Sequence, residues 1–92
     1  METIFKKEIE ELREKLEVLR SAAGLTQDEL ASWVGISRQT YISIIRGQSK
    51  MPWRTYLSFI FYFDANKKTH LFLHYLNLYP EKYIDQINKK EE

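Results

Sequence analysis

Hydrophobic residues in the first quarter of the chain recur at the spacing of a helix. The apolar positions, three or four residues apart, are Ile9, Leu12, Leu16, Leu19 and Ala23. Residues at these intervals share one face of an α-helix, and the opposite face is rich in Glu and Lys. The pattern predicts a helix from near Phe5 to Ala23 that packs against the rest of the domain, because two heptads are few for a coiled coil.

Two shorter helical patterns follow, separated by a glycine. Thr26 and Glu29 form a capping box, which starts a second helix that ends before Gly35. A third helix starts at Ser37, a residue type that favours the N-cap, and runs to Arg46. The residues expected to face inward are Leu30, Ala31 and Val34 on the second helix and Tyr41, Ile44 and Ile45 on the third.

The last third of the chain also has a helical pattern. One helix is expected from Pro52 to near Phe63 and another over about residues 67–79. After Pro80, a short amphipathic helix can form on the apolar positions Tyr83, Ile84 and Ile87. The chain has no alternating strand pattern, so we expect an all-α fold of about five helices with an extended first helix and a short C-terminal tail.

Length and composition narrow the class of protein. The chain has 92 residues and no cysteine, which allows one small domain and excludes disulfides and thiolate metal sites. The N-terminal residues are charged throughout, and the apolar run Phe59–Phe63 is far too short to span a bilayer. We therefore expect a cytoplasmic protein that does not enter a membrane.

The net charge of +1 conceals a strong asymmetry along the chain. Residues 1–29 carry eight acidic and five basic side chains, and residues 64–92 carry five of each. Residues 30–63 carry no acidic side chain and four basic ones, Arg38, Arg46, Lys50 and Arg54. A stretch without carboxylates creates a local positive potential that favours an anionic partner, although a solvated basic face would have the same composition.

The segment from Gly24 to Tyr41 has the spacing of a helix-turn-helix. Ala31 is small where two helices would cross, Gly35 suits a left-handed turn, and the apolar Ile36 can fill the angle between the helices. Such a unit needs these three residue types in this register, whereas an ordinary helical hairpin does not.

This segment resembles the phage-repressor or Cro type of helix-turn-helix domain, also called the xenobiotic-response-element type. The matching stretches are Leu25–Ala31, Gly35–Thr40, Arg46-Gly47 and Pro52 after a short basic loop. The resemblance covers about residues 12–63. It implies a five-helix bundle similar to that of lambda repressor, with the third helix in the DNA major groove and usually within a homodimer. The expected division is an N-terminal extension of the first helix over residues 1–11, a DNA-binding domain over 12–66, and a C-terminal helix and tail over 67–92.

The third helix has side chains suited to reading bases. Its inward positions leave an outer face composed of Arg38, Gln39, Ile42 and Ser43. Arginine can form two hydrogen bonds to guanine and glutamine two to adenine, while an apolar side chain can contact a thymine methyl group. The alternative for Ile42 is that it packs internally or against a partner.

Phosphate contacts are expected around this face. Gln27 lies at the N-terminus of the second helix, where a side-chain amide and backbone N–H groups can meet a phosphate, and the resemblance implies the same role. The other candidates are Ser37, Thr40, Arg46, Gln48, Ser49 and Lys50, with Arg54 as the least certain.

One position departs from the family pattern. Members usually have a glutamate where this chain has Ile45, paired with an arginine that matches Arg20. Arg20 is therefore expected either to pair with another acid, such as Glu17, or to contact DNA.

The helix after Pro52 is apolar on nearly every side, so it must be covered on more than one face. A chain this short is expected to leave part of that surface for a second copy. We expect a homodimer interface that includes Phe59, Tyr62, Phe63, Phe72, Tyr75 and Tyr79. The alternative is an intramolecular core closed by the first helix, and Trp33 fits either role.

Nothing in the sequence favours catalysis. His70 and His74 lie one turn apart, but we expect no metal site, since no third ligand of suitable type lies nearby. There is no phosphate-binding glycine loop and no nucleophile motif, so no cofactor is expected.

The sequence thus predicts a DNA-binding transcriptional regulator, either a repressor or an autoregulator, that binds an approximately palindromic operator in double-stranded DNA as a homodimer. Two alternatives remain open. One is the antitoxin of a toxin–antitoxin pair, with a protein partner of its own. The other is a protein-interaction domain that has lost DNA binding.

Overall fold

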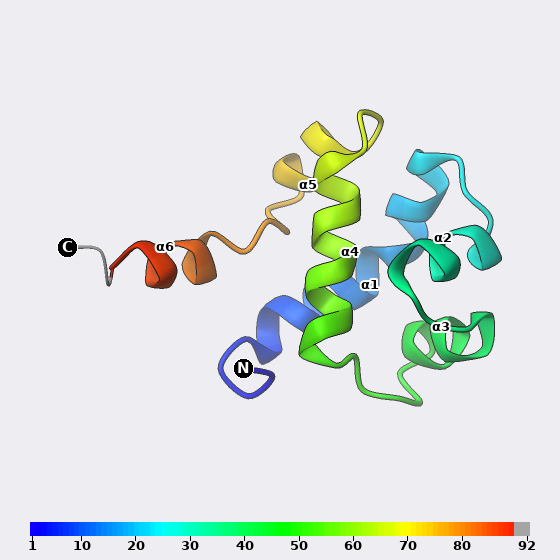
Figure 1. Cartoon of the computed structure of the whole chain (residues 1–92), viewed down its shortest axis with the longest axis horizontal. Coiled ribbons are helices and arrows are strands. Elements are labelled where there is room, and N and C mark those ends of the chain that lie inside the picture. The colour runs from blue at the N-terminus through cyan, green and yellow to red at the C-terminus, as the bar shows by residue number, and fades with distance from the viewer. Residues whose placement is uncertain (90–92) are drawn as a thin grey trace.

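The computed structural model describes residues 1–89 and contains six helices and no strand over that range. They are α1 (Lys6–Ala23), α2 (Gln27–Val34), α3 (Arg38–Ile45), α4 (Trp53–Ala65), α5 (His70–Tyr75) and α6 (Glu81–Lys89). Helix α4 runs through the middle of the molecule, with α2 and α3 on one side and α6 projecting from the other (Figure 1). The prediction of an all-α fold is confirmed.

Helix α1 forms where the apolar spacing predicts it. Its buried residues are Ile9, Leu12, Leu16, Leu19 and Ala23. This face packs against α3 and α4, while charged residues cover the solvent side. Gly24 then ends the helix in the left-handed conformation at a φ of 75°, which a residue without Cβ adopts at little cost.

The caps predicted for α2 and α3 are both present. The Thr26 hydroxyl accepts a hydrogen bond from the Glu29 N–H at 3.1 Å, and the Glu29 carboxylate accepts one from the Thr26 N–H at 2.8 Å. At the start of α3, the Ser37 hydroxyl accepts a hydrogen bond from the Thr40 N–H at 3.0 Å. These bonds satisfy N–H groups that have no partner within a helix, so local chemistry sets where both helices begin.

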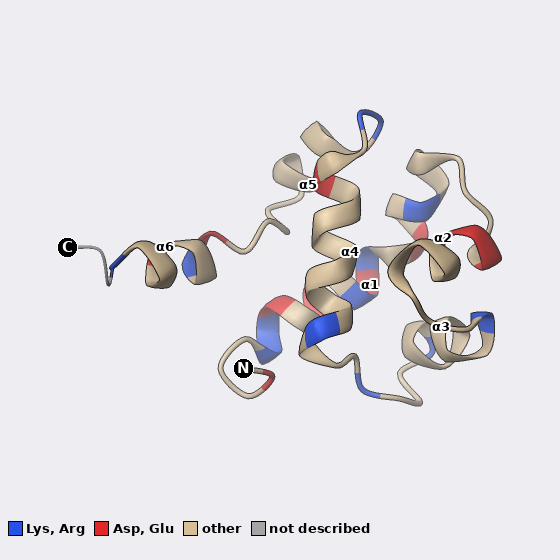
Figure 2. Ribbon diagram, in the orientation of Figure 1, with Lys and Arg blue, Asp and Glu red and all other residues tan. Residues whose placement is uncertain are grey.

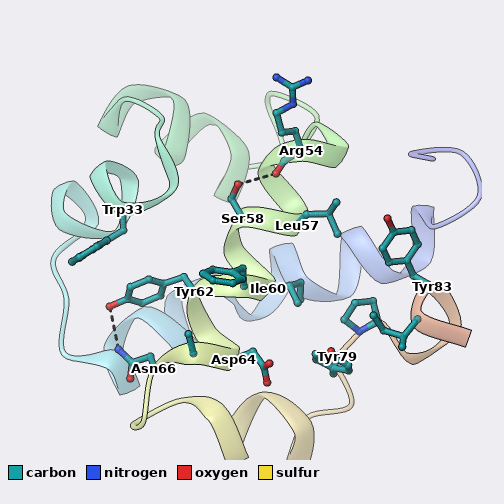
Figure 3. Close-up of a pocket in the computed structure, with 14 residues that line it drawn as sticks. Trp33, Arg54, Leu57, Ser58, Ile60, Tyr62, Asp64, Asn66, Tyr79 and Tyr83 are labelled. Atoms are coloured by element: carbon teal, nitrogen blue, oxygen red, sulfur yellow. Dashed lines mark hydrogen bonds between the residues drawn. The ribbon is translucent and has the colours of Figure 1, made fainter. Parts of the chain in front are cut away.

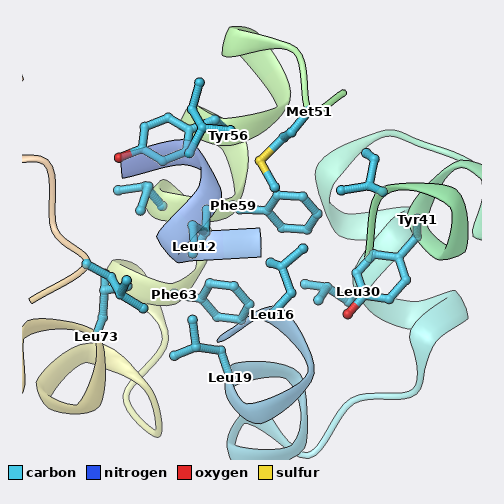
Figure 4. Packing of buried hydrophobic residues seen from close by; sticks show 14 of the residues in the cluster. Leu12, Leu16, Leu19, Leu30, Tyr41, Met51, Tyr56, Phe59, Phe63 and Leu73 are labelled. Atoms are coloured by element: carbon cyan, nitrogen blue, oxygen red, sulfur yellow. The ribbon is translucent and has the colours of Figure 1, made fainter. Parts of the chain in front are cut away.

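The core lies between α4 and the helices around it (Figure 4). Phe59 and Phe63 of α4 stack with their ring centroids 6.3 Å apart, and Tyr41 of α3 meets Phe59 edge-on at 6.1 Å. Leu16 of α1 and Leu30 of α2 are fully buried in the same cluster. The core therefore joins the first four helices into one unit.

Two of the predicted dimer residues belong to this core. Phe59 and Phe63 have no exposed surface within a single chain, so the prediction that they contact a second copy is wrong. Helix α4 is apolar nearly all round, and α1 and α2 cover the face on which both phenylalanines lie. Both residues instead belong to the intramolecular core, which was the alternative interpretation of the sequence.

The C-terminal third differs in detail from the sequence expectation. Helix α4 extends to Ala65, and α5 covers only His70–Tyr75 instead of residues 67–79. A turn at residues 66–69 delays its start, and Asn77, with a φ of 59°, ends the helical path after it. Leu73 and Leu78 still reach the core, so this part of the chain is packed against the bundle.

Helix α6 is the short tail helix that the apolar spacing allowed. No residue in it is fully buried, and it extends away from the body of the molecule (Figure 1). Its anchor is Tyr83, whose ring meets Trp53 at 5.1 Å and Phe5 at 5.7 Å, both edge-on. The last three residues of the predicted C-terminal segment lie outside the described residues. Among those described, no helix has the length and hydrophobicity needed to span a bilayer.

Candidate nucleic-acid interface

Helices α2 and α3 form a helix-turn-helix. Ala31 is buried where the two helices pack together, and Gly35 has a φ of 80° at the turn. The N–H groups of Gly35 and Ile36 donate to the carbonyl oxygens of Ser32 and Ala31 at 3.2 and 3.0 Å, which closes the end of α2. Ile36 is half-buried and packs against the core. All three positions identified in the sequence therefore have the environment that the motif requires.

On the outer face of α3, the residues of the N-terminal half are exposed to solvent. Arg38 and Gln39 are exposed, as predicted for residues that read bases. Ser43 is half-buried, and Ile42 is half-buried and packs against the core cluster. The part of the helix free for a ligand is thus concentrated at its first turn.

That first turn is electropositive. It contains no acidic residue, and the N–H groups at the start of a helix carry a partial positive charge. Ser37, predicted to contact phosphate, is exposed, but its hydroxyl also donates to Thr40 Oγ1 at 2.9 Å. The pair of hydroxyls thus shapes the cap of α3 and lies at the same surface as Arg38.

The loop after α3 continues this basic surface. Arg46, Gln48, Ser49 and Lys50 are all exposed, and Figure 2 shows the positive positions of α3, the loop and the start of α4 with no acidic position between them. The loop is ordered by contacts of its own. The N–H groups of Gln48 and Ser49 donate to the Ser43 carbonyl at 2.9 and 3.2 Å, and the Ser43 and Ser49 hydroxyls lie 2.6 Å apart.

A hydrogen-bond network behind α3 resolves the position of Arg20. Its guanidinium Nε donates to the Glu17 carboxylate at 2.9 Å, and its Nη1 donates to the Leu25 carbonyl at 2.6 Å. Arg20 therefore pairs with Glu17, which was one of the two alternatives. Ile45, which replaces the usual glutamate, is half-buried against the core, and its carbonyl oxygen accepts a hydrogen bond from Arg13 at 3.0 Å.

Glu17 also receives hydrogen bonds from the next two helices. The Tyr41 hydroxyl of α3 donates to it at 2.6 Å, and the Gln27 amide of α2 donates at 3.1 Å. Hydrogen bonds from Arg20 first, and then from Tyr41 and Gln27, hold the pKa of the Glu17 carboxyl below its usual range. The half-buried Gln27 side chain, predicted to contact phosphate, is thus positioned by the protein itself.

Sequence reasoning missed that Tyr41 and Gln27 share the Glu17 carboxylate. The residues lie 24 and 10 positions apart from it in the chain, so only the packing of α1 against the helix-turn-helix brings them together.

Asp64 was also missed. Its carboxylate oxygen lies 3.0 Å from His70 Nδ1 and 2.8 Å from His74 Nε2, so the expectation that no third metal-ligating residue lies near the two histidines is wrong. The turn at residues 66–69 folds α5 back onto the end of α4 and brings the three side chains together. Asp64 precedes His70 by only six residues, which was the available sequence signal.

The aromatic surface lies away from α3. Trp33 and Phe61 are 68% and 77% exposed and line an open groove along α4 that continues to Tyr79 and Tyr83 (Figure 3). On α5, Leu71 and Tyr75 are 79% and 84% exposed. Of the remaining predicted dimer residues, Tyr62, Phe72 and Tyr79 are half-buried.

Comparison with known proteins identifies the family of this unit. Residues 11–68 match a family model described as a helix-turn-helix domain, and this range includes α2, α3, α4 and most of α1. The chain matches no curated protein and no solved structure. The matched range covers well over half of the 92 residues and contains the turn, the caps and the buried crossing described above. The chain therefore belongs to the helix-turn-helix domain family.

Proposed function

We propose that this protein is a transcriptional regulator that binds double-stranded DNA at specific sites, with α3 as its recognition helix. Membership of the helix-turn-helix family supports DNA binding by a regulator. Residues 12–66 are the proposed DNA-binding unit, arranged like the bundle of a phage-repressor domain. A repressor or autoregulator fits this unit, since blocking a promoter needs little beyond DNA binding.

The observation that carries the proposal is the exposed first turn of α3. Arg38 and Gln39 point outward from a helix whose other face is anchored by the buried Tyr41 and Ile44. Both side chains can form paired hydrogen bonds to base edges in the major groove. The first turn of α3 contains no acidic residue that would repel a phosphate backbone near these side chains.

The surrounding residues fit a role in positioning the helix. Exposed Arg46 and Lys50 and the polar loop between them can meet backbone phosphates, which set orientation and affinity but not sequence. Gln27 lies at the first turn of α2, where N–H groups favour an anion but Asp28 and Glu29 add negative charge. Arg46, Lys50 and the loop between them lie within residues 30–63, a stretch that contains no carboxylate.

A homodimer would place two copies of α3 in successive major grooves on one side of the duplex. The half-sites would then lie about 34 Å apart, and the operator would be approximately palindromic. The exposed apolar residues on α5 and in the groove along α4 supply a surface for such an assembly.

The proposal is tested by selecting bound sites from a random duplex library and measuring affinity for the preferred site. Arg38→Ala and Gln39→Ala should each weaken binding to that site by about 1–3 kcal/mol and relax the base preference at one position. The matched control is Lys82→Ala, which removes an exposed side chain on α6 far from α3. Specific binding that survives both α3 substitutions would exclude α3 as the recognition helix.

Lys50→Ala provides a second measurement on the same duplexes. It should weaken all sequences about equally and reduce the dependence of affinity on salt, because a phosphate contact releases a counterion. Lys82→Ala should leave that dependence unchanged. A chain with no salt-dependent duplex binding at all would instead favour a protein-interaction domain.

A further inference from the structure

We propose that Asp64, His70 and His74 form a binding site for a divalent first-row transition-metal ion. These are the two histidines of the chain, which has no cysteine. They lie at the junction of α4 and α5, apart from the recognition face on α3. Nothing in the proposed DNA binding requires them, so the site is independent of that function.

The three ligand atoms already converge. A single Asp64 carboxylate oxygen lies 3.0 Å from His70 Nδ1 and 2.8 Å from His74 Nε2, and all three ligand atoms lie within 4.8 Å of one another. Bonds of about 2.0–2.1 Å to a tetrahedral ion place neighbouring ligand atoms about 3.3 Å apart. Small side-chain rotations would therefore suffice to accommodate an ion.

The turn that carries these residues is held by its own hydrogen bonds. The Thr69 hydroxyl is buried and donates to the Phe63 carbonyl at 2.8 Å, and the Lys68 N–H donates to the Asn66 side chain at 2.8 Å. The His74 ring stacks on Tyr79 with centroids 4.6 Å apart. The backbone and one of the two imidazoles are thus positioned before a metal arrives, which lowers the entropic cost of binding.

Exposure and donor chemistry determine which ion fits. The side chains are 33% to 49% exposed, so an ion can enter and keep solvent in its remaining coordination positions. Two imidazoles with one carboxylate suit zinc and its first-row neighbours, whereas magnesium and calcium prefer oxygen ligands. His70 Nδ1 also lies 2.7 Å from the backbone carbonyl oxygen of Asp64. A bound ion would take the place of that hydrogen bond and of the one between His74 and the Asp64 carboxylate, and it would link α5 to α4.

Zinc titration of the full chain tests the site. With two histidines, the imidazole region of an NMR spectrum reports only on His70 and His74. Zinc should shift both rings and saturate at one ion per chain, and the same titration followed by thermal unfolding should show a rise in Tm. Magnesium at the same concentrations should change neither measurement.

Substitutions then assign the ligands. Asp64→Asn, His70→Ala and His74→Ala should each reduce zinc affinity more than about tenfold, measured by calorimetry. Asp85→Asn, which alters an exposed carboxylate on α6, should bind zinc like the unmodified chain. Circular dichroism checks that each variant folds.

Three results would overturn the site. They are uptake that does not saturate at one ion, a zinc response confined to one histidine, and affinity undiminished by loss of His74. The stoichiometry and the histidine response are measured on the unmodified chain. They can therefore contradict the proposal even if a variant fails to fold. None of these measurements depends on DNA, so failure of the metal site and failure of the proposed function are separate outcomes.

Discussion

Two buried tyrosines illustrate how much a single polar atom matters in this small core. Both Tyr41 and Tyr56 are fully buried, and burial raises the pKa of each phenol. The Tyr41 hydroxyl donates to the Glu17 carboxylate. The Tyr56 hydroxyl is buried with no hydrogen-bond partner among the described residues, so the two groups make opposite contributions to stability.

Replacing each tyrosine by phenylalanine should separate the two cases. Tyr41→Phe should lower the free energy of unfolding by about 1–3 kcal/mol, because it removes a hydrogen bond to a charged group and leaves Glu17 with one donor fewer. Tyr56→Phe should leave that free energy unchanged or raise it by up to about 1 kcal/mol, because it removes an unpaired polar atom. Chemical denaturation measures both, and an equal loss in the two variants would contradict the assignment.

Glu17 should make the stability of the domain depend on pH in the acidic range. Hydrogen bonds from Arg20, Tyr41 and Gln27 lower its pKa in the folded state below the ordinary value of 4.5. The folded state therefore binds this proton less readily than the unfolded state. The stabilisation is present above pH 4.5 and is lost as the pH falls through the lower folded value.

Chemical denaturation at a series of pH values from about 3 to about 7, which spans the ordinary carboxyl pKa, checks this dependence. Glu17→Gln should be less stable than the unmodified chain at neutral pH and should lose less stability on acidification. The matched control is Glu14→Gln, one turn earlier on α1 and exposed, which should keep the original pH dependence. Identical acid sensitivity in Glu17→Gln and the unmodified chain would exclude this role.

At the scale of the structural elements, the turn between α2 and α3 depends on the left-handed backbone conformation of Gly35. Gly35 has a φ of 80°, and a Cβ added there would meet nothing within 4 Å. Any penalty for a side chain therefore comes from the left-handed backbone and not from crowding. The capping bonds on either side of the turn fix the helix ends, so the angle between α2 and α3 depends on this residue.

Substitution of Gly35 tests that account. Gly35→Ala should reduce the free energy of unfolding by about 1–2 kcal/mol, the cost of a left-handed conformation for an ordinary residue. Gly35→Asn should lose less, because asparagine tolerates this region better. Thermal unfolding of the pair measures the difference. A larger loss for asparagine would indicate that side-chain crowding, not backbone strain, limits the position.

At the scale of the whole molecule, a single chain leaves several large apolar side chains exposed to water. Leu71 and Tyr75 are one turn apart on α5 and almost fully exposed, and Phe61 and Trp33 line the groove along α4. A small protein that leaves several large apolar side chains in water gains by covering them. The proposed homodimer does so without using the residues of the recognition helix.

Sedimentation at micromolar concentration tests the assembly. The unmodified protein should sediment at twice the chain mass of 11.1 kDa. The double variant Leu71→Ala, Tyr75→Ala should shift toward the mass of one chain, because it removes the exposed apolar side chains of α5. Val18→Ala, at an exposed apolar position on α1, should leave the mass unchanged. A single 11.1 kDa species for the unmodified chain would contradict the homodimer.

Short-range chemistry accounts for what could be predicted before the structure. Helix α1, the caps at Thr26 and Ser37 and the turn at Gly35 all follow from side chains within four residues of one another, because helical spacing, capping and backbone preference act over one turn. The same local order places Arg38 and Gln39 outside the core. The helix-turn-helix could therefore be predicted from the amino-acid sequence alone.

Packing between distant segments decided the rest. Phe59 and Phe61 are alike in sequence, yet one is fully buried and the other is 77% exposed, because only the docking of α1 and α2 selects the covered face of α4. The sharing of Glu17 by three helices depends likewise on how α1 packs against α2 and α3. Asp64 is close to the two histidines in the chain, but only the turn that folds α5 back onto α4 brings the three side chains together. Glu17 gains Gln27 and Tyr41 as partners only through the arrangement of the helices, because hydrophobic spacing and capping act over a single turn and do not specify contacts between helices.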